Sequence, residues 1–195
     1  SPVDAVYTKD DIKDIDVTEK LIGLIGYPWN KMYKSSLLKS NHSRFMNGLT
    51  PVEDMVFNSE VLSKLNTIVF IDKQLTHYMQ RPRISLGSKY YENYFDLKKT
   101  AIKSIENLLI SWNVDRKLID DLISLLYFDV LKSSIRNLCR SKKSIKEKSR
   151  HIDQIMQKER VSASIKNIKP VKMKDIIVKA LLILKMYPVL TVIYK

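Results

Sequence analysis

A chain of 195 residues is long enough for one folded domain with a hydrophobic core, or for a domain with an appendage. Its 45% hydrophobic and 28% charged residues, with only four glycines, exclude a disordered chain and favour a helical one. The formal net charge is +13, and the single cysteine, Cys139, excludes an internal disulfide and fits a reducing compartment.

The first part of the chain, residues 1–90, is expected to mix helices with strands. No signal peptide is expected, because the first twenty residues are acidic and contain no apolar stretch. A helix is predicted to end at Gly26, and a turn with a short helix follows over residues 27–41. The β-branched and aromatic run at residues 67–71 predicts a buried strand, and residues 81–88 predict a basic loop.

From residue 91 to residue 195 the patterns predict helices. Apolar residues recur at intervals of three and four over 94–112 and again over 115–139. A basic helix or linker is expected up to Lys169, and an amphipathic tail follows Pro170. The longest apolar run, 176–186, is interrupted by lysines and is too short to span a bilayer. Two domains are therefore expected, at 1–90 and 91–195.

The positive charge is concentrated in residues 131–174, which hold 14 lysines and arginines against three acids. Together with the amphipathic tail, this stretch predicts contact with an anionic membrane surface. A solvated helical face is the structural alternative. A basic module for nucleic acid is a third possibility, but most aromatic residues precede residue 131, so no nucleic acid is expected. A helical scaffold for a protein partner is the fourth.

Two adjacent acids stand where an apolar segment begins, in the stretch "TPVEDMVFN". Thr50-x-x-Glu53 matches a capping box, with Pro51 at the first helical position. This structural role explains the presence of Glu53 but does not explain that of Asp54. Partial burial of Asp54 beside apolar neighbours would raise its pKa, which makes it a candidate proton acceptor.

The segments "PWNKMYKSSLL", "EDMVFN" and "IVFIDKQLTHYMQRPRIS" resemble, in order and spacing, the C-terminal half of bacterial family 2 glycosyltransferases. In that family a Trp-Asn/Asp-Lys-Leu-Tyr-Lys segment precedes Gly-Glu-Asp-x-x-Phe, and a strand then leads to a His-Tyr-x-x-Arg-x-x-Ser loop. The resemblance covers roughly residues 20–100. One departure is Val52, which stands where the family has glycine.

The resemblance implies an α+β, predominantly helical chain: the C-terminal part of a GT-A lobe followed by a helical extension. It implies an inverting transfer of sugar from a nucleotide-sugar donor to a saccharide or lipid-linked acceptor in cell-envelope polysaccharide synthesis. Asp54 would be the general base, and Glu53 would position it or the acceptor. Trp29, Asn30 and Lys31 would line the acceptor site, although Trp29 could equally be a core residue.

The same resemblance assigns the donor diphosphate to Arg81, Arg83 and Ser85, whose fork-shaped guanidinium groups and hydroxyl suit phosphate oxygens. His77 could complete a metal shell. The structural alternatives are solvated arginines in a loop and a histidine that faces solvent from a strand.

A complete enzyme of this family also needs a nucleotide-binding half with an Asp-x-Asp motif that holds Mg²⁺ or Mn²⁺. Asp14-Ile15-Asp16 fits that motif literally but lacks a preceding hydrophobic strand, so it is rejected. The chain is therefore expected to be part of a larger enzyme, inactive and without cofactor by itself. The resemblance places that enzyme in the cytoplasm, at the inner face of the cell membrane.

Overall fold

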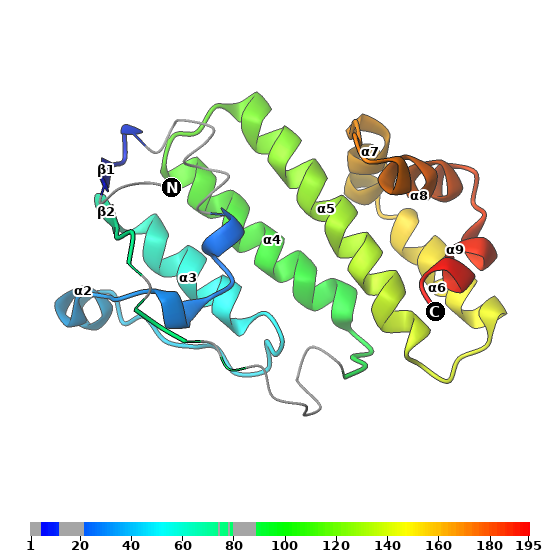
Figure 1. Cartoon of the computed structure of the whole chain (residues 1–195), viewed down its shortest axis with the longest axis horizontal. Coiled ribbons are helices and arrows are strands. Elements are labelled where there is room, and N and C mark those ends of the chain that lie inside the picture. The colour runs from blue at the N-terminus through cyan, green and yellow to red at the C-terminus, as the bar shows by residue number, and fades with distance from the viewer. Residues whose placement is uncertain (1–4, 12–21, 74, 78, 80–88) are drawn as a thin grey trace. The chain divides into compact units, whose positions relative to one another are not determined.

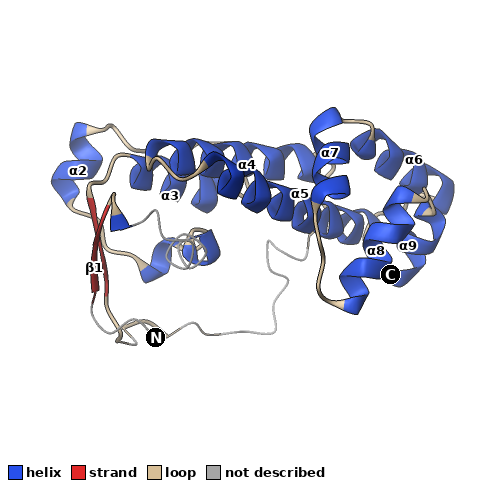
Figure 2. Cartoon of the chain, turned by 90° about the horizontal axis from the view of Figure 1, so that it is seen from above, coloured by secondary structure: helices blue, strands red, loops and turns tan. Residues whose placement is uncertain are grey.

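The computed structural model describes residues 5–11, 22–73, 75–77, 79 and 89–195. This part of the chain is predominantly helical, with one small antiparallel sheet (Figures 1 and 2), so the expected mostly helical α+β class is confirmed. None of its helices is both long enough and apolar enough to cross a membrane. The elements, in chain order, are β1 (Ala5–Thr8), η2 (Pro28–Asn30), α2 (Ser35–Ser40), α3 (Glu53–Ser63), β2 (Thr67–Phe70), α4 (Tyr94–Ser111), α5 (Arg116–Cys139), α6 (Ile145–Met156), α7 (Glu159–Asn167), α8 (Met173–Ile183) and α9 (Tyr187–Ile193).

The chain forms two compact units. The first comprises Ser1–Arg83 with Thr100–Ile119, and the second comprises Ile84–Lys99 with Asp120–Lys195. Helices α4 and α5 each contribute residues to both units. Each unit contains residues from both sides of residue 90, so the units do not correspond to the two expected domains. The domain boundary expected near residue 90 therefore stays a prediction.

In the first unit, β1 pairs with β2 in an antiparallel register that places Val6 opposite Val69 (Figure 2). The strand predicted at 67–71 is therefore confirmed, but its expected burial is wrong. Val69 is 58% exposed and Ile71 52% exposed. Along both strands half-buried and exposed residues alternate, which is typical of a sheet covered on one face only. On the half-buried face, the Tyr7 and Phe70 rings meet edge to face at 5.5 Å.

The core of the first unit is built by α3 and by the first-unit part of α4. Apolar side chains at helical intervals are buried on both: Val56, Phe57, Val61 and Leu62 on α3, and Ala101, Ile102, Ile105, Leu108 and Leu109 on α4. Trp112 follows α4 and is almost fully buried, and its indole N–H donates to the Leu62 carbonyl oxygen at 3.1 Å. This bond satisfies the polar atom of the largest core side chain and fixes the end of α3.

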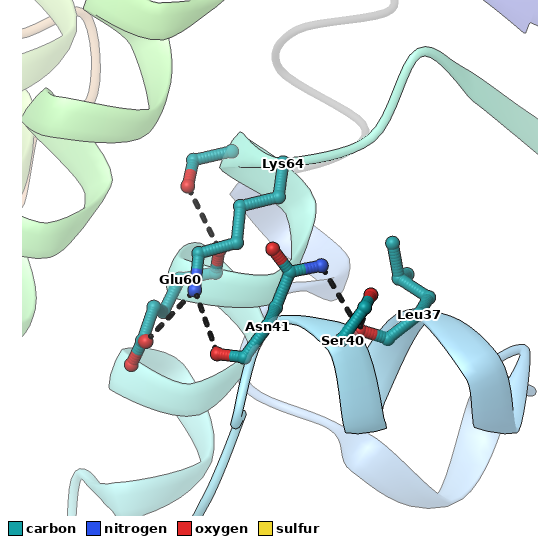
Figure 3. Close-up of polar contacts among 6 residues, drawn as sticks. Leu37, Ser40, Asn41, Glu60 and Lys64 are labelled. Atoms are coloured by element: carbon teal, nitrogen blue, oxygen red, sulfur yellow. Dashed lines mark hydrogen bonds and ion pairs between the residues drawn. The ribbon is translucent and has the colours of Figure 1, made fainter.

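The end of α2 is joined to α3 by a small polar cluster (Figure 3). The Lys64 amine contacts the Glu60 carboxylate at 3.2 Å and donates to the Asn41 carbonyl oxygen at 3.4 Å. The Asn41 amide in turn donates to the Leu37 carbonyl oxygen at 2.9 Å. Because the Lys64–Glu60 pair is largely solvated, it contributes less than about 1 kcal/mol to stability.

In the second unit, α9 packs against α6 and α8, and α7 follows α6 (Figure 1). Ile152 and Ile155 of α6 and Tyr187 and Leu190 of α9 are buried. The amphipathic tail thus forms two helices, and Lys185 takes a positive φ of 55° between them.

Candidate functional site

The candidate site lies in the first unit, where the segment containing η2 meets the first turns of α3. Asn58, which is completely buried, joins the two. Its amide N–H donates to the Ile25 carbonyl oxygen at 2.5 Å, and its amide oxygen accepts a hydrogen bond from the Tyr33 hydroxyl. The buried Phe57 ring stacks on Phe45 at 4.1 Å.

The Asp54 carboxylate lies one helical turn before Asn58, on the same face of α3. Asp54 is half-buried, and no hydrogen bond or ion pair joins its carboxylate to another described residue. Burial and the neighbouring Glu53 charge raise the pKa of Asp54, while the Lys31 charge acts in the opposite direction. The site therefore holds a carboxylate whose affinity for a proton is above the ordinary value.

Lys31 is held by the backbone of the segment before it. Its amine donates to the carbonyl oxygens of Leu24 and Tyr27, both at 2.6 Å, and to the Asn30 side-chain oxygen at 2.8 Å. Burial lowers the pKa of Lys31 to about 8, against the opposing effect of the Asp54 charge. These bonds fix the amine where its charge acts on Asp54.

Tyr33 is a further group whose titration responds to the Asp54 charge. Burial, together with the Asp54 charge, raises the pKa of Tyr33 to about 12, so the phenol stays protonated at neutral pH. The structure thus brings Lys31 and Tyr33 close enough to Asp54 for the Asp54 charge to affect the pKa of both, although they come from a different segment of the sequence.

Glu53 does not form the capping box predicted for it. The N-cap of α3 is Val52, no side chain caps it, and Glu53 is the first residue of the helix. The Val52 N–H donates to the Leu49 carbonyl oxygen at 2.6 Å, and the Val52 side chain is fully buried. Burial of Val52 therefore takes the N-cap position away from Thr50. Both acids still lie in the first turn, where the helix dipole favours negative charge.

The Glu53 oxygen Oε2 is buried and has no hydrogen-bond partner among the described residues. A buried carboxylate oxygen without a donor is costly by about 1–3 kcal/mol, and more when charged.

Trp29 lies in η2 and is 46% exposed, so the core alternative for this residue is wrong. Its ring centroid lies 5.3 Å from that of Tyr27, which is equally exposed, with the two rings tilted by 50°. Asn30 is exposed and accepts the hydrogen bond from Lys31 described above. Of the three predicted acceptor residues, Trp29 and Asn30 present side chains to solvent, and the Lys31 amine is bound to oxygens of its own segment.

His77 is exposed and lies outside regular secondary structure, so it does not face solvent from a strand as the structural alternative expected. The neighbouring Thr76 hydroxyl donates to the Trp29 carbonyl oxygen at 3.4 Å, which brings this segment beside η2. Within the described ranges no three His, Cys, Asp or Glu residues are placed to hold a metal ion. Arg81, Arg83 and Ser85 lie outside the described residues.

Sequence reasoning missed Asn58 and Tyr33 as parts of the site. The signal that could have found Asn58 is its spacing of four residues from Asp54 in an otherwise apolar helix face. Tyr33 stands within the "PWNKMY" motif, but nothing in the motif indicates that its hydroxyl reaches α3.

Comparison of the chain with protein-family models, with curated proteins and with solved structures gives no match.

Proposed function

We propose that the chain is the acceptor-side, C-terminal portion of an inverting GT-A glycosyltransferase that acts in cell-envelope polysaccharide synthesis. The observation that supports the proposal is that Lys31 and Tyr33 lie close enough to Asp54 for its charge to affect their pKa values. Two of the three motifs that resemble family 2 enzymes supply these residues, and they converge on one carboxylate. The raised pKa of Asp54 suits a group that accepts a proton.

In this proposal the Asp54 carboxylate accepts the proton of a saccharide hydroxyl. The hydroxyl oxygen bonds to the anomeric carbon of the donor sugar from the face opposite the nucleotide diphosphate. The bond from that carbon to the diphosphate breaks, and the diphosphate leaves with the electron pair. General-base assistance of this kind contributes about 10²–10⁴-fold to a rate.

The remaining groups position the acceptor. The exposed faces of Tyr27 and Trp29 offer flat apolar surfaces on which a sugar ring can stack. Glu53, which shares the first turn of α3 with Asp54, positions the acceptor or Asp54 in this proposal. Asn58 holds the two segments together and thereby sets the distance between the aromatic pair and Asp54.

The donor side of the proposed reaction is not built by the described residues. Arg81, Arg83, Ser85 and the Mg²⁺ or Mn²⁺ of the complete enzyme stay predictions. Within the described part of the chain His77 belongs to no group of three or more His, Cys, Asp or Glu residues placed to hold a metal ion, so its role as a ligand stays a prediction.

The proposal is tested by Asp54→Asn in the protein that carries this chain together with its nucleotide-binding half. Sugar transfer, measured as release of nucleotide diphosphate in the presence of acceptor, should fall by about 10²–10⁴-fold, with donor binding nearly unchanged. Asp121→Asn, the same change at an exposed position of α5, serves as control and should retain full activity. Unchanged turnover in Asp54→Asn would remove the assignment.

A second proposal concerns the partner of the second unit. The helices α8 and α9 and their connection expose a large apolar set, comprising Met173, Ile176, Ile177, Ile183, Leu184, Met186, Val189, Val192 and Ile193. The exposed lysines Lys172, Lys174 and Lys185 stand among them, and the one acid of this stretch, Asp175, is paired with Lys132. Exposed apolar side chains flanked by lysines suit an anionic membrane leaflet.

The contacts of the aromatic rings favour this partner over nucleic acid. In the second unit Lys132 lies over Phe128, Arg160 over Tyr127, and both Arg136 and Lys174 over Tyr194. Tyr127, Phe128 and Tyr194 are also buried, so they are not platforms on which bases could stack.

A further inference from the structure

A cavity of about 400 Å³ lies in the second unit, between the end of α5, the start of α8 and the end of α9. Arg136, Cys139 and Arg140 of α5, Lys174 of α8 and the C-terminal residues Ile193, Tyr194 and Lys195 line it. No acidic side chain is among these lining residues, which all belong to the described part of the chain. Four of the seven lining side chains are therefore basic.

Two of its cations converge on one aromatic ring. The Arg136 guanidinium and the Lys174 amine each lie 5.7 Å from the centroid of the Tyr194 ring, and Tyr194 is only 9% exposed. Within the described residues, neither Arg136 nor Lys174 forms an ion pair with a carboxylate. Both cations therefore line the same pocket, where a bound anion would interact favourably with each.

The nearest acids do not neutralise the cavity. Asp129 and Asp175 both bind the Lys132 amine, at 2.8 and 2.9 Å. Lys132 thus takes up much of their charge, and neither acid lines the cavity. The charges of Arg136 and Lys174 therefore stay available to a ligand.

The walls are also fixed in place. The Cys139 thiol donates to the Thr191 carbonyl oxygen at 3.4 Å, which joins the end of α5 to α9. Helix α9 packs in turn on α8. The helices that carry the cations therefore need not rearrange when an anion binds, which favours affinity.

We propose that this cavity binds a phosphate-bearing ligand through Arg136 and Lys174. Guanidinium forks pair with phosphate oxygens in two parallel hydrogen bonds, and lysine adds a point charge. The volume lies in the range of small-ligand sites, which admits a phosphate with a further group attached. That ligand is either a soluble phosphate compound or the headgroup of an anionic lipid. The site lies in the other unit from Asp54, and the proposal does not rest on the transferase function.

The test uses the 195-residue chain and two probes, inorganic pyrophosphate followed by calorimetry and phosphatidic acid vesicles followed by co-sedimentation. The double variant Arg136→Gln/Lys174→Gln should bind at least tenfold more weakly. The control variant Lys146→Gln/Arg150→Gln removes the same charges from exposed positions of α6 and should bind within twofold of the unaltered chain. Circular dichroism checks that both variants are folded.

The two probes identify the source of the phosphate. Pyrophosphate binding that only the cavity variant loses assigns a soluble phosphate compound, and vesicle binding lost in the same way assigns a lipid headgroup. Three results would overturn the proposal: no binding of either probe, equal weakening in both double variants, or binding that the cavity variant leaves intact. Pyrophosphate does not use the exposed apolar residues of α8 and α9, so its result is independent of membrane docking.

Discussion

At the scale of single residues, the geometry around Asp54 depends on Asn58. This side chain is completely buried and makes one hydrogen bond to each side, accepting from Tyr33 and donating to Ile25. A buried amide stabilises the fold as long as both its N–H and its oxygen are hydrogen-bonded. The loss of either partner leaves a buried polar group without a hydrogen bond, which destabilises the folded state.

Asn58→Ala should therefore lower the free energy of unfolding by about 2–3 kcal/mol, since it leaves the Tyr33 hydroxyl and the Ile25 carbonyl oxygen unpaired and opens a small cavity. Tyr33→Phe removes only one of the two bonds and should cost about 1 kcal/mol. Urea unfolding followed by the fluorescence of the buried Trp112 measures both changes. Asn107→Ala, at an exposed position of α4, is the control. Equal stabilities of Asn58→Ala and this control would show that the amide does not hold the site together.

The sequence predicted Asp54 and Lys31 as site residues but could not show how they meet. Their convergence depends on a tertiary contact, the Asn58 bridge, that no local pattern encodes. The capping box at Thr50 and Glu53 failed for a related reason. Val52 occupies the N-cap of α3 with its side chain buried, and burying a valine contributes about 1.5–3 kcal/mol against about 1 kcal/mol for a favourable cap, so a tertiary contact of this size can outweigh the local cap signal.

At the scale of elements, periodicity located the long helices correctly. The apolar intervals at 94–112 and 115–139 correspond to α4 and α5, since a period of 3.6 sustained over many residues is typical of a helix that buries one face. The short strand β1 was missed, because four residues flanked by acids carry too little pattern. The burial of β2 was overestimated, because composition marks a strand but does not show which layers cover it.

Helix α6 contains the capping box that α3 lacks. The Ser144 hydroxyl accepts from the Glu147 backbone N–H at 3.3 Å, and the Glu147 carboxylate accepts from the Ser144 N–H at 2.7 Å. The hydrogen bond from Ser144 lowers the pKa of Glu147, so this arrangement persists down to acidic pH. No buried apolar residue competes for the N-cap position, since Ser144 and Ile145 are both exposed.

Ser144→Ala should destabilise the start of α6 by about 1 kcal/mol. Amide hydrogen exchange measured by NMR should accordingly become about fivefold faster at Glu147 and its neighbours in the first turn. Ser162→Ala, inside α7, removes a hydroxyl that caps no helix and should leave these rates unchanged. Exchange at Glu147 as slow as in the unaltered chain would mean that packing alone holds this helix end.

At the scale of the whole molecule, the positive charge is concentrated in the second unit, which also holds the exposed apolar set of α8 and α9. The stretch 131–174, with 14 basic residues against three acids, belongs entirely to it. Ion pairs take up only part of this charge, as in the contacts of Lys143 with Glu92 and of Lys158 with Asp96. The exposed apolar set of α8 and α9 follows directly in sequence. The second unit thus supplies both the positive charge that attracts an anionic membrane and the apolar side chains that can be buried in it. A helical face that only contacts water does not need this combination.

Membrane docking through this apolar set predicts that Ile177→Ser/Val192→Ser weakens binding to anionic vesicles at least tenfold, because burying each side chain contributes about 1.5–3 kcal/mol. Ile110→Ser/Leu125→Ser makes a comparable change at exposed positions of α4 and α5 and should leave binding intact. Co-sedimentation with phosphatidylglycerol vesicles measures both, and added salt should weaken binding of the unaltered chain because screening reduces the contribution of the lysines. If salt weakens vesicle binding but the Ile177→Ser/Val192→Ser variant binds normally, the positive charge alone accounts for membrane binding. Equal losses in the two double variants would show instead that the apolar residues act through folding and that α8 and α9 face another partner.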